Sequence, residues 1–121
     1  MARILVVDDY PVAVKLLAYT LRTDGHDVLP ASSGQDALDV LARETVELAI
    51  FDLVMPEMDG VTLLRRVRSD PRWADLPVIM LTGSAQDDDR EVAREAGAND
   101  FLTKPASSRE VLETVRRLLG A

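Results

Sequence analysis

The side chains best suited to chemistry in this chain each follow a short apolar run. They comprise three carboxylates, a hydroxyl and an amine: Asp8, Asp9, Asp52, Thr82 and Lys104. Carboxylates that lie together repel, since two like charges about 4 Å apart cost roughly 4 kcal/mol at an effective dielectric of 20. A hard divalent cation such as Mg²⁺ relieves that repulsion because it takes oxygen ligands, and a lysine ammonium can do the same. These residue types indicate a metal-dependent acidic site, provided that the fold brings them together.

The apolar runs alternate with stretches of helical spacing. The runs occupy residues 4–7, 28–29, 48–51, 78–81 and 101–102. Between them, apolar residues recur at i, i+3, i+4 and i+7, as the helical period requires. Five strands alternating with five helices predict a (βα)5 fold, a doubly wound, flavodoxin-like parallel sheet of five strands. Pro30 cannot donate to a ladder and so belongs on an edge strand, which favours the strand order 2-1-3-4-5.

In a sheet of this order, ligands bind beyond the carboxyl ends of the strands, at the point where the strand order reverses. That point lies between the strand that ends at Asp8 and Asp9 and the strand that ends at Asp52. Neighbouring strands are about 4.8 Å apart, so the three carboxylates should share one pocket. Thr82 and Lys104 end the fourth and fifth strands on the same rim.

Each of these residues also has a plain structural explanation. Asp9 could cap the helix that begins near Pro11, and Asp52 could open a turn. Lys104 could be a solvated lysine, and Thr82 an ordinary strand residue or helix cap. The joint pattern favours a site, because chance would scatter such groups over both ends of the sheet.

The segment after the first strand excludes the common phosphate-binding loops. Those loops are rich in glycine so that backbone N–H groups can surround an anion, whereas this segment reads Asp8-Asp9-Tyr10-Pro11. Two carboxylates repel phosphate, and Pro11 has no N–H. A flavin or dinucleotide site is therefore not expected, and a phosphoryl group can enter only after a cation.

Composition limits the function further. The chain has 121 residues, 14 basic and 21 acidic side chains, a net charge of −7 and no cysteine. This length fits one domain, residues 1–121, with no effector domain in the chain. The acidic balance argues against direct nucleic-acid binding, and no apolar run approaches the ~20 residues of a membrane span. We expect a cytoplasmic domain without a signal peptide, in which His26 is a solvated loop residue.

The chain resembles the receiver domains of two-component response regulators. The resemblance spans Arg3 to Leu119 and rests on motifs in the family's order: Asp8-Asp9, Asp52, Met55-Pro56-Glu57-Met58-Asp59-Gly60, Thr82 and Lys104-Pro105. It implies that Asp52 is the phosphoacceptor and that Asp8, Asp9, Asp52 and the backbone carbonyl of Val54 hold Mg²⁺, with Mn²⁺ as a substitute.

The same resemblance assigns roles to the other rim residues. Lys104 would pair with the acidic cluster and then with the phosphoryl group. Thr82 and Phe101 would form a switch, and the peptide bond between Lys104 and Pro105 would be cis. The phosphoryl donor would be a sensor histidine kinase or a histidine phosphotransfer protein.

The implied function is a phosphorylation-dependent signalling switch. The surface of the fourth helix, fifth strand and fifth helix would change and control the binding of a downstream protein target. A phosphorylation-dependent dimer is a further option. The chain would not be an enzyme in the metabolic sense, since it would catalyse only its own phosphorylation and dephosphorylation.

Two other functions fit the residues less well. A phosphoaspartyl hydrolase of the Asp-x-Asp type needs a second acid where Val54 stands. A degenerate receiver that serves only as a binding module should have lost its acidic, hydroxyl or lysine sites, and all are present. The signalling switch is therefore the favoured interpretation.

Three particulars shape the expected behaviour. Phe101 has no hydroxyl, so exposing its ring is unfavourable, and an inward orientation or burial by a partner is expected. Val54 and Ser84 should flank the path of the attacking water, and an apolar Val54 predicts moderately slow self-dephosphorylation. The fourth helix, whose apolar positions are mostly alanine, should be the least firmly docked.

Overall fold

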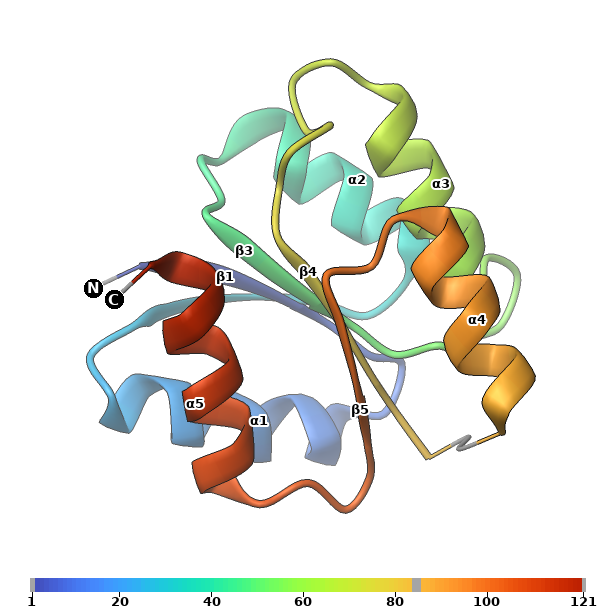
Figure 1. The fold of residues 1–121 in the computed structure, drawn as a ribbon. Coiled ribbons are helices and arrows are strands. Elements are labelled where there is room, and N and C mark those ends of the chain that lie inside the picture. Colours follow the sequence, from blue (N-terminus) through green and yellow to red (C-terminus); the bar gives the residue numbers. More distant parts are fainter. Residues whose placement is uncertain (1, 84–85, 121) are drawn as a thin grey trace.

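The computed structural model describes residues 2–83 and 86–120, and strands and helices alternate along them (Figure 1). The strands are β1 (Arg3–Val7), β2 (Asp27–Ala31), β3 (Leu48–Phe51), β4 (Val78–Thr82) and β5 (Asp100–Thr103). The helices are α1 (Pro11–Thr23), α2 (Gly34–Arg43), α3 (Gly60–Ser69), α4 (Asp87–Ala96) and α5 (Ser108–Leu119). All strand pairs are parallel, in the order β2-β1-β3-β4-β5. The predicted fold class and strand order are confirmed.

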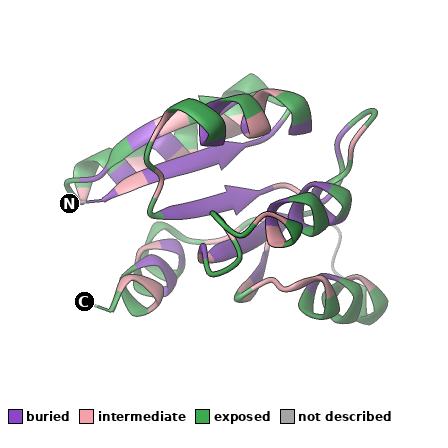
Figure 2. Ribbon diagram, turned by 90° about the horizontal axis from the view of Figure 1, so that it is seen from above, coloured by how far each residue is buried: buried purple, intermediate pink, exposed green. Residues whose placement is uncertain are grey.

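The central strands β3 and β4 are buried throughout because both faces of the sheet are covered (Figure 2). On one face, β-strand residues such as Val7, Phe51 and Met80 pack against α2, α3 and α4. On the other, residues such as Val6 and Ile50 pack against α1 and α5. Every residue of β3 and β4 is buried, as a strand with helices on both sides must be.

Pro30 lies on the edge strand β2, as its missing N–H requires. The Asp27 N–H donates to the Ala2 carbonyl and the Ala31 carbonyl accepts from the Asp8 N–H, so these two residues face β1. Residues at alternate positions direct their backbone groups to the open edge, where Pro30 offers no donor. This arrangement disfavours the addition of another strand at β2.

The loop from β3 to α3 is held at both ends. Asp59 caps α3, because its carboxylate accepts a hydrogen bond from the Thr62 N–H at 2.8 Å. Gly60 sits so close to β3 that a Cβ there would lie 2.2 Å from the backbone oxygen of Asp52. The start of α3 therefore packs directly on the backbone of Asp52.

Helix α4 is the least buried of the helices, in agreement with the prediction. Ala93 is its only buried residue, and three aspartates fill its first turn, where they favour the helix dipole. Gly97 ends the helix in the left-handed conformation, with φ of 110°. None of the helices in the described part of the chain is long and apolar enough to cross a membrane.

His26 is not the solvated loop residue that the sequence suggested. Its imidazole is buried, and Nδ1 accepts a hydrogen bond from the Ala2 N–H at 3.1 Å. Nε2 lies 3.6 Å from a carboxylate oxygen of Asp24. The ring thus joins the end of α1 to the start of β1, a contact between distant segments that local sequence does not reveal.

Candidate functional site

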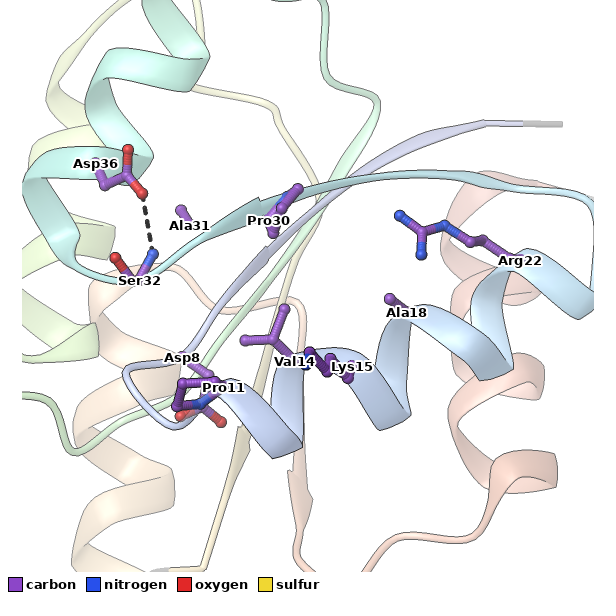
Figure 3. A pocket seen from close by; sticks show the side chains of 10 residues that line it. All are labelled: Asp8, Pro11, Val14, Lys15, Ala18, Arg22, Pro30, Ala31, Ser32 and Asp36. Carbon is purple, nitrogen blue, oxygen red and sulfur yellow. Dashed lines mark hydrogen bonds between the residues drawn. The ribbon is translucent and has the colours of Figure 1, made fainter.

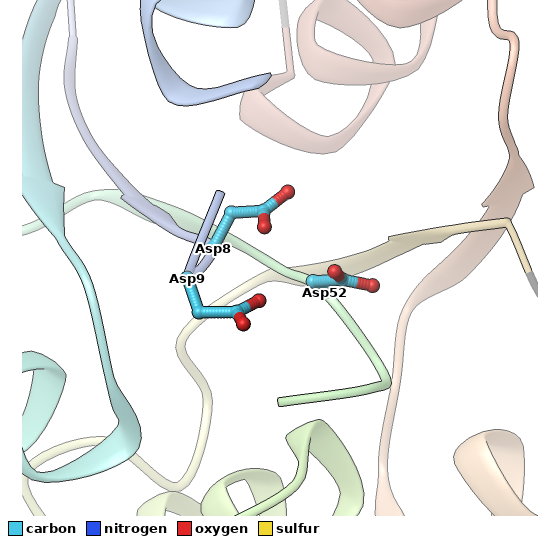
Figure 4. A group of neighbouring side chains, drawn as sticks. All are labelled: Asp8, Asp9 and Asp52. Atoms are coloured by element: carbon cyan, nitrogen blue, oxygen red, sulfur yellow. The ribbon is translucent and has the colours of Figure 1, made fainter. Parts of the chain in front are cut away.

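Three carboxylates converge at the carboxyl ends of β1 and β3 (Figure 4). Val7 and Phe51 are paired in register, so the residues that follow them leave the sheet side by side. One oxygen from each of Asp8, Asp9 and Asp52 can be chosen so that all three lie within 4.8 Å of one another. Asp8 is buried and Asp9 is exposed, so the cluster opens to solvent on the side of Asp9.

Lys104 supplies a positive charge to this cluster. Its Nζ lies 2.8 Å from Oδ2 of Asp8 and 3.7 Å from Oδ2 of Asp52. The Lys104 backbone N–H donates to the Thr82 carbonyl at 2.8 Å, which continues the pairing of β4 and β5. The peptide bond between Lys104 and Pro105 is cis.

Both oxygens of Asp8 are engaged. Oδ1 accepts a hydrogen bond from the Tyr10 N–H at 3.0 Å, and Oδ2 accepts one from Lys104. Asp52 is held more loosely, since its Oδ1 lies 3.4 Å from the Val54 N–H. The Thr82 side chain also acts on Asp52 and lowers the pKa of its carboxyl. Asp52 is thus the less firmly fixed of these two carboxylates.

The charge state of Asp52 reflects opposing influences. Partial burial raises the pKa of its carboxyl above the ordinary value, and the nearby charge of Asp8 adds to this. Lys104, the Thr82 hydroxyl and the Val54 N–H act in the opposite direction. The net pKa is raised, because burial outweighs the single cation.

The donor set fits a hard divalent cation. All three side chains offer carboxylate oxygens, the ligands that Mg²⁺ prefers. Among the described residues, none donates a hydrogen bond to the Asp9 carboxylate, which points toward the cluster with its oxygens available (Figure 4). The open side near Asp9 leaves room for the waters that Mg²⁺ keeps.

A cavity of about 410 Å³ lies between α1 and the edge of β2 (Figure 3). It borders Asp8 but does not include Asp9, Asp52 or Lys104. Its charged residues are of both signs: Asp8, Lys15, Arg22 and Asp36. The cavity therefore favours no particular charge on a ligand, and it shares only Asp8 with the acidic cluster.

The remaining candidate residues lie around the rim. Thr82 ends β4 and is buried. Phe101 is 9% exposed and packs within the cluster of buried residues beneath α4. Val54 is 64% exposed beside Asp52. Ser84 lies outside the described residues.

Two contributors were missed by sequence reasoning. The Tyr10 N–H fixes Asp8, and the guanidinium of Arg90 lies 4.9 Å from the centre of the Phe101 ring. A backbone donor two residues after an aspartate is a common turn feature and could have been foreseen. The contact of Arg90 with Phe101 depends on how α4 packs on β5, for which no local signal exists.

Comparisons with known proteins agree with this geometry. The family model of the response regulator receiver domain matches residues 4–116. The protein PilH of Pseudomonas aeruginosa is 35% identical over 120 residues, which are 99% of this chain and 99% of PilH. The transcriptional regulator RpaA of Synechocystis is 40% identical over 119 residues, which are 98% of this chain but 49% of RpaA. The chain thus spans about half the length of that regulator.

A solved structure shows the same architecture. The receiver domain of the sensor histidine kinase PA1611 from Pseudomonas aeruginosa superposes with a TM-score of 0.91 at 31% identity. The match covers 99% of this chain and 98% of the other. That structure holds a magnesium ion coordinated in its active site cleft.

Proposed function

The chain belongs to the family of response regulator receiver domains, and from this premise we propose that it is a switch phosphorylated on Asp52. The family implies phosphorylation-dependent signalling. The observation that supports Asp52 as the acceptor is its place in the cluster. Its carboxylate lies beside Asp8, Asp9 and Lys104 and is less firmly held than that of Asp8.

The residues that would hold Mg²⁺ are Asp8, Asp9 and Asp52, with the backbone carbonyl of Val54. The magnesium ion in the PA1611 receiver domain supports this assignment. When bound, Mg²⁺ offsets the repulsion between the carboxylates and an incoming phosphoryl group and orients the phosphoryl oxygens. Mn²⁺, which also accepts oxygen ligands, would substitute.

The chemical step is transfer of a phosphoryl group to the Asp52 carboxylate. A carboxylate oxygen forms a bond to phosphorus as the bond from phosphorus to the donor's histidine nitrogen breaks, and the electron pair stays on that nitrogen. Before transfer, the ammonium of Lys104 lies close to Asp8 and Asp52. After transfer, it pairs with the phosphoryl oxygens. Catalysis is thus mostly positioning and charge stabilisation.

The response to phosphorylation runs through Thr82 and Phe101. The acyl phosphate carries roughly two negative charges and strong acceptor oxygens. The Thr82 hydroxyl, which acts on Asp52, turns toward these oxygens. This movement frees space on the inward side of Phe101, and the ring occupies that space. The surface of α4, β5 and α5 then changes and controls binding of a downstream protein, or of a second copy of the chain.

The phosphoryl donor is a histidine kinase or a histidine phosphotransfer protein, and α1 offers it a docking surface. Val12, Leu16 and Tyr19 are 50%, 66% and 72% exposed and follow one stripe of the helix. Tyr10, 61% exposed, extends the stripe toward the acidic cluster. An exposed apolar stripe of this kind marks a protein contact, and it begins next to Asp9.

The proposed function is tested by labelling with acetyl phosphate. Wild-type protein should gain one phosphoryl group with Mg²⁺ and none with a chelator. Asp52→Asn should gain none under either condition, while its circular dichroism spectrum stays that of the wild type. Equal labelling of Asp52→Asn would refute the proposal.

The docking surface is tested by changing the donor. With a phosphorylated histidine phosphotransfer protein that labels the wild type, Leu16→Asp should slow transfer at least tenfold. Labelling by acetyl phosphate should not change, because that small donor needs no docking surface. Ser69→Asp, an equally exposed change on α3, is the control. Equal slowing with both donors would show that Leu16 acts on the site itself and not on docking.

A further inference from the structure

The Phe101 ring is buried on the face of the sheet that α4 covers. Phe101 is paired with Met80 across β4 and β5, and its ring is 9% exposed on the face of the sheet that α4 covers. Helix α4 buries only Ala93. The small side chain of Ala93 covers only part of the ring, so the rest of its cover must come from another residue of α4.

The side chain of Arg90 provides that cover. Its guanidinium carbon lies 4.9 Å from the ring centre, within the range of a cation–π contact. Arg90 forms no ion pair with any other residue of the described segments, whereas Arg94 on the same helix pairs with Glu91. The Phe101 ring is thus the contact that the structure gives to the Arg90 cation.

Space for a second ring position lies beside this contact. A cavity of about 220 Å³ is bordered by Phe101, Arg90 and Arg94, with Ala98, Asn99 and Asp100. A cavity of roughly 150 Å³ is enough to hold benzene, so the ring has room to move outward. Arg90 and Phe101 both line this space and are in contact with each other.

We propose that Arg90 is a positioning residue that holds Phe101 inward and so favours the phosphorylated form of the switch. The proposal rests on the proposed function, in which the inward ring accompanies phosphorylation. Phe101 lacks a hydroxyl that water could bind. The exposure of its ring is therefore controlled by the guanidinium of Arg90 on α4. Because the inward ring and phosphorylation favour each other, a group that stabilises the inward ring also favours the phosphorylated form.

The test uses ¹⁹F NMR of protein labelled with 4-fluorophenylalanine. The chain has two phenylalanines, Phe101 and the fully buried Phe51. Phe101→Leu assigns the second resonance. The protein is titrated with beryllium fluoride in the presence of Mg²⁺, a mimic of the phosphoryl group, and the midpoint of the Phe101 shift is measured.

Removing the cation should weaken the response. The midpoint for Arg90→Gln should rise about two- to fivefold, the effect of losing one exposed cation–π contact. Arg90→Lys should restore most of the wild-type midpoint, because it keeps the positive charge. Arg94→Gln, which removes a neighbouring cation that pairs with Glu91 instead, should leave the midpoint unchanged.

The outcomes separate the two proposals. If the Phe101 resonance moves neither in the wild type nor in Arg90→Gln although Asp52 is labelled by acetyl phosphate, the Phe101 switch of the proposed function is wrong. If it moves and Arg90→Gln has the wild-type midpoint, the role of Arg90 alone is refuted. An equal rise for Arg94→Gln would also refute it, since the effect would then be general to charge on α4.

Discussion

Opposing electrostatic influences act on the Asp52 carboxylate, and they make the site reactive. Burial and the charge of Asp8 raise the pKa of its carboxyl, and Lys104 only partly offsets them. An acid whose folded-state pKa is raised favours folding when protonated, and this contribution is lost as the pH rises through the raised pKa. At neutral pH, the ionised Asp52 therefore reduces the stability of the metal-free protein.

Asp52→Asn should accordingly increase the free energy of unfolding at pH 7 without Mg²⁺. The gain over the wild type should shrink as the pH falls through the raised pKa toward the ordinary value of 3.8, where the wild-type carboxyl is also neutral. Urea unfolding curves recorded between pH 3.5 and 7, at intervals of about 0.5 pH units, measure this gain in the free energy of unfolding. A gain that is constant across this range would show that the carboxylate charge is not its cause.

Val54 lies where we expect the attacking water to approach the phosphorylated Asp52. Its side chain is 64% exposed next to Asp52 and carries no polar group that could orient a water molecule. Val54→Asn should therefore shorten the lifetime of the phosphorylated form by about tenfold, which corresponds to one hydrogen bond to the attacking water. The decay is followed after removal of acetyl phosphate. An unchanged lifetime would contradict this role.

At the level of single residues, the sequence predicted the acidic cluster because its members directly follow strands. Asp8, Asp9 and Asp52 follow β1 and β3, and parallel neighbours end at the same edge. The role of Arg90 could not be predicted in this way. It depends on the distance between a helix and a strand that are joined by a turn, and charged helical residues usually face solvent.

The start of α3 determines where Asp52 is held. Because a Cβ at Gly60 would lie 2.2 Å from the Asp52 backbone oxygen and 2.7 Å from Cε of Met80, the backbone must shift to accept any side chain. Gly60→Ala should lower the free energy of unfolding by about 1–3 kcal/mol and slow phosphorylation by acetyl phosphate.

The matched control is Gly83→Ala, where an added Cβ would meet nothing within 4 Å. Its free energy of unfolding should stay within about 0.5 kcal/mol of the wild type. Equal losses in the two variants would mean that glycine flexibility, and not the close approach of α3 to Asp52, explains the effect.

The end of α4 is anchored by Arg68 of α3. Its guanidinium donates to the carbonyls of Gly97 and Trp73 and to Oδ1 of Asn99, at 2.8–3.2 Å. This clamp holds the C-terminal end of a helix that buries little else. It explains how α4 can be loosely packed and still stay on the sheet.

Arg68→Met should lower the free energy of unfolding by about 1.5–3 kcal/mol, because two half-buried carbonyls, of Gly97 and Trp73, lose a charged donor. Arg66→Met, an exposed neighbour on the same helix, should change it little. Hydrogen exchange should show the loss of protection concentrated in α4 and the segment to β5. Uniform loss across the sheet would contradict a local clamp.

For the elements, sequence patterns predicted the type and order of strands and helices well. Strand β2 was placed at the edge by Pro30, and α4 was expected to be loosely docked from its alanines. The clamp at Arg68 and the buried ring of His26 were not predicted. Both depend on contacts between segments that are far apart in sequence, and hydrophobic spacing reports only which face of an element is buried.

For the whole molecule, the gathered carboxylates predict that Mg²⁺ stabilises the fold. A ligand that binds only the folded state adds about 1.4 kcal/mol to the free energy of unfolding at ten times its Kd. Urea unfolding with and without Mg²⁺ should show this gain in the wild type, and the gain should fall in Asp9→Asn. No effect of Mg²⁺ at millimolar concentration would contradict a metal site at Asp8, Asp9 and Asp52.

The most direct measurement locates the phosphoryl group itself. After reaction with acetyl phosphate and Mg²⁺, the acyl phosphate is reduced with borohydride, and the modified residue is identified by peptide mass spectrometry. Our account predicts a single reduced residue at Asp52. Modification at Asp8, at Asp9 or at any other carboxylate instead would contradict it.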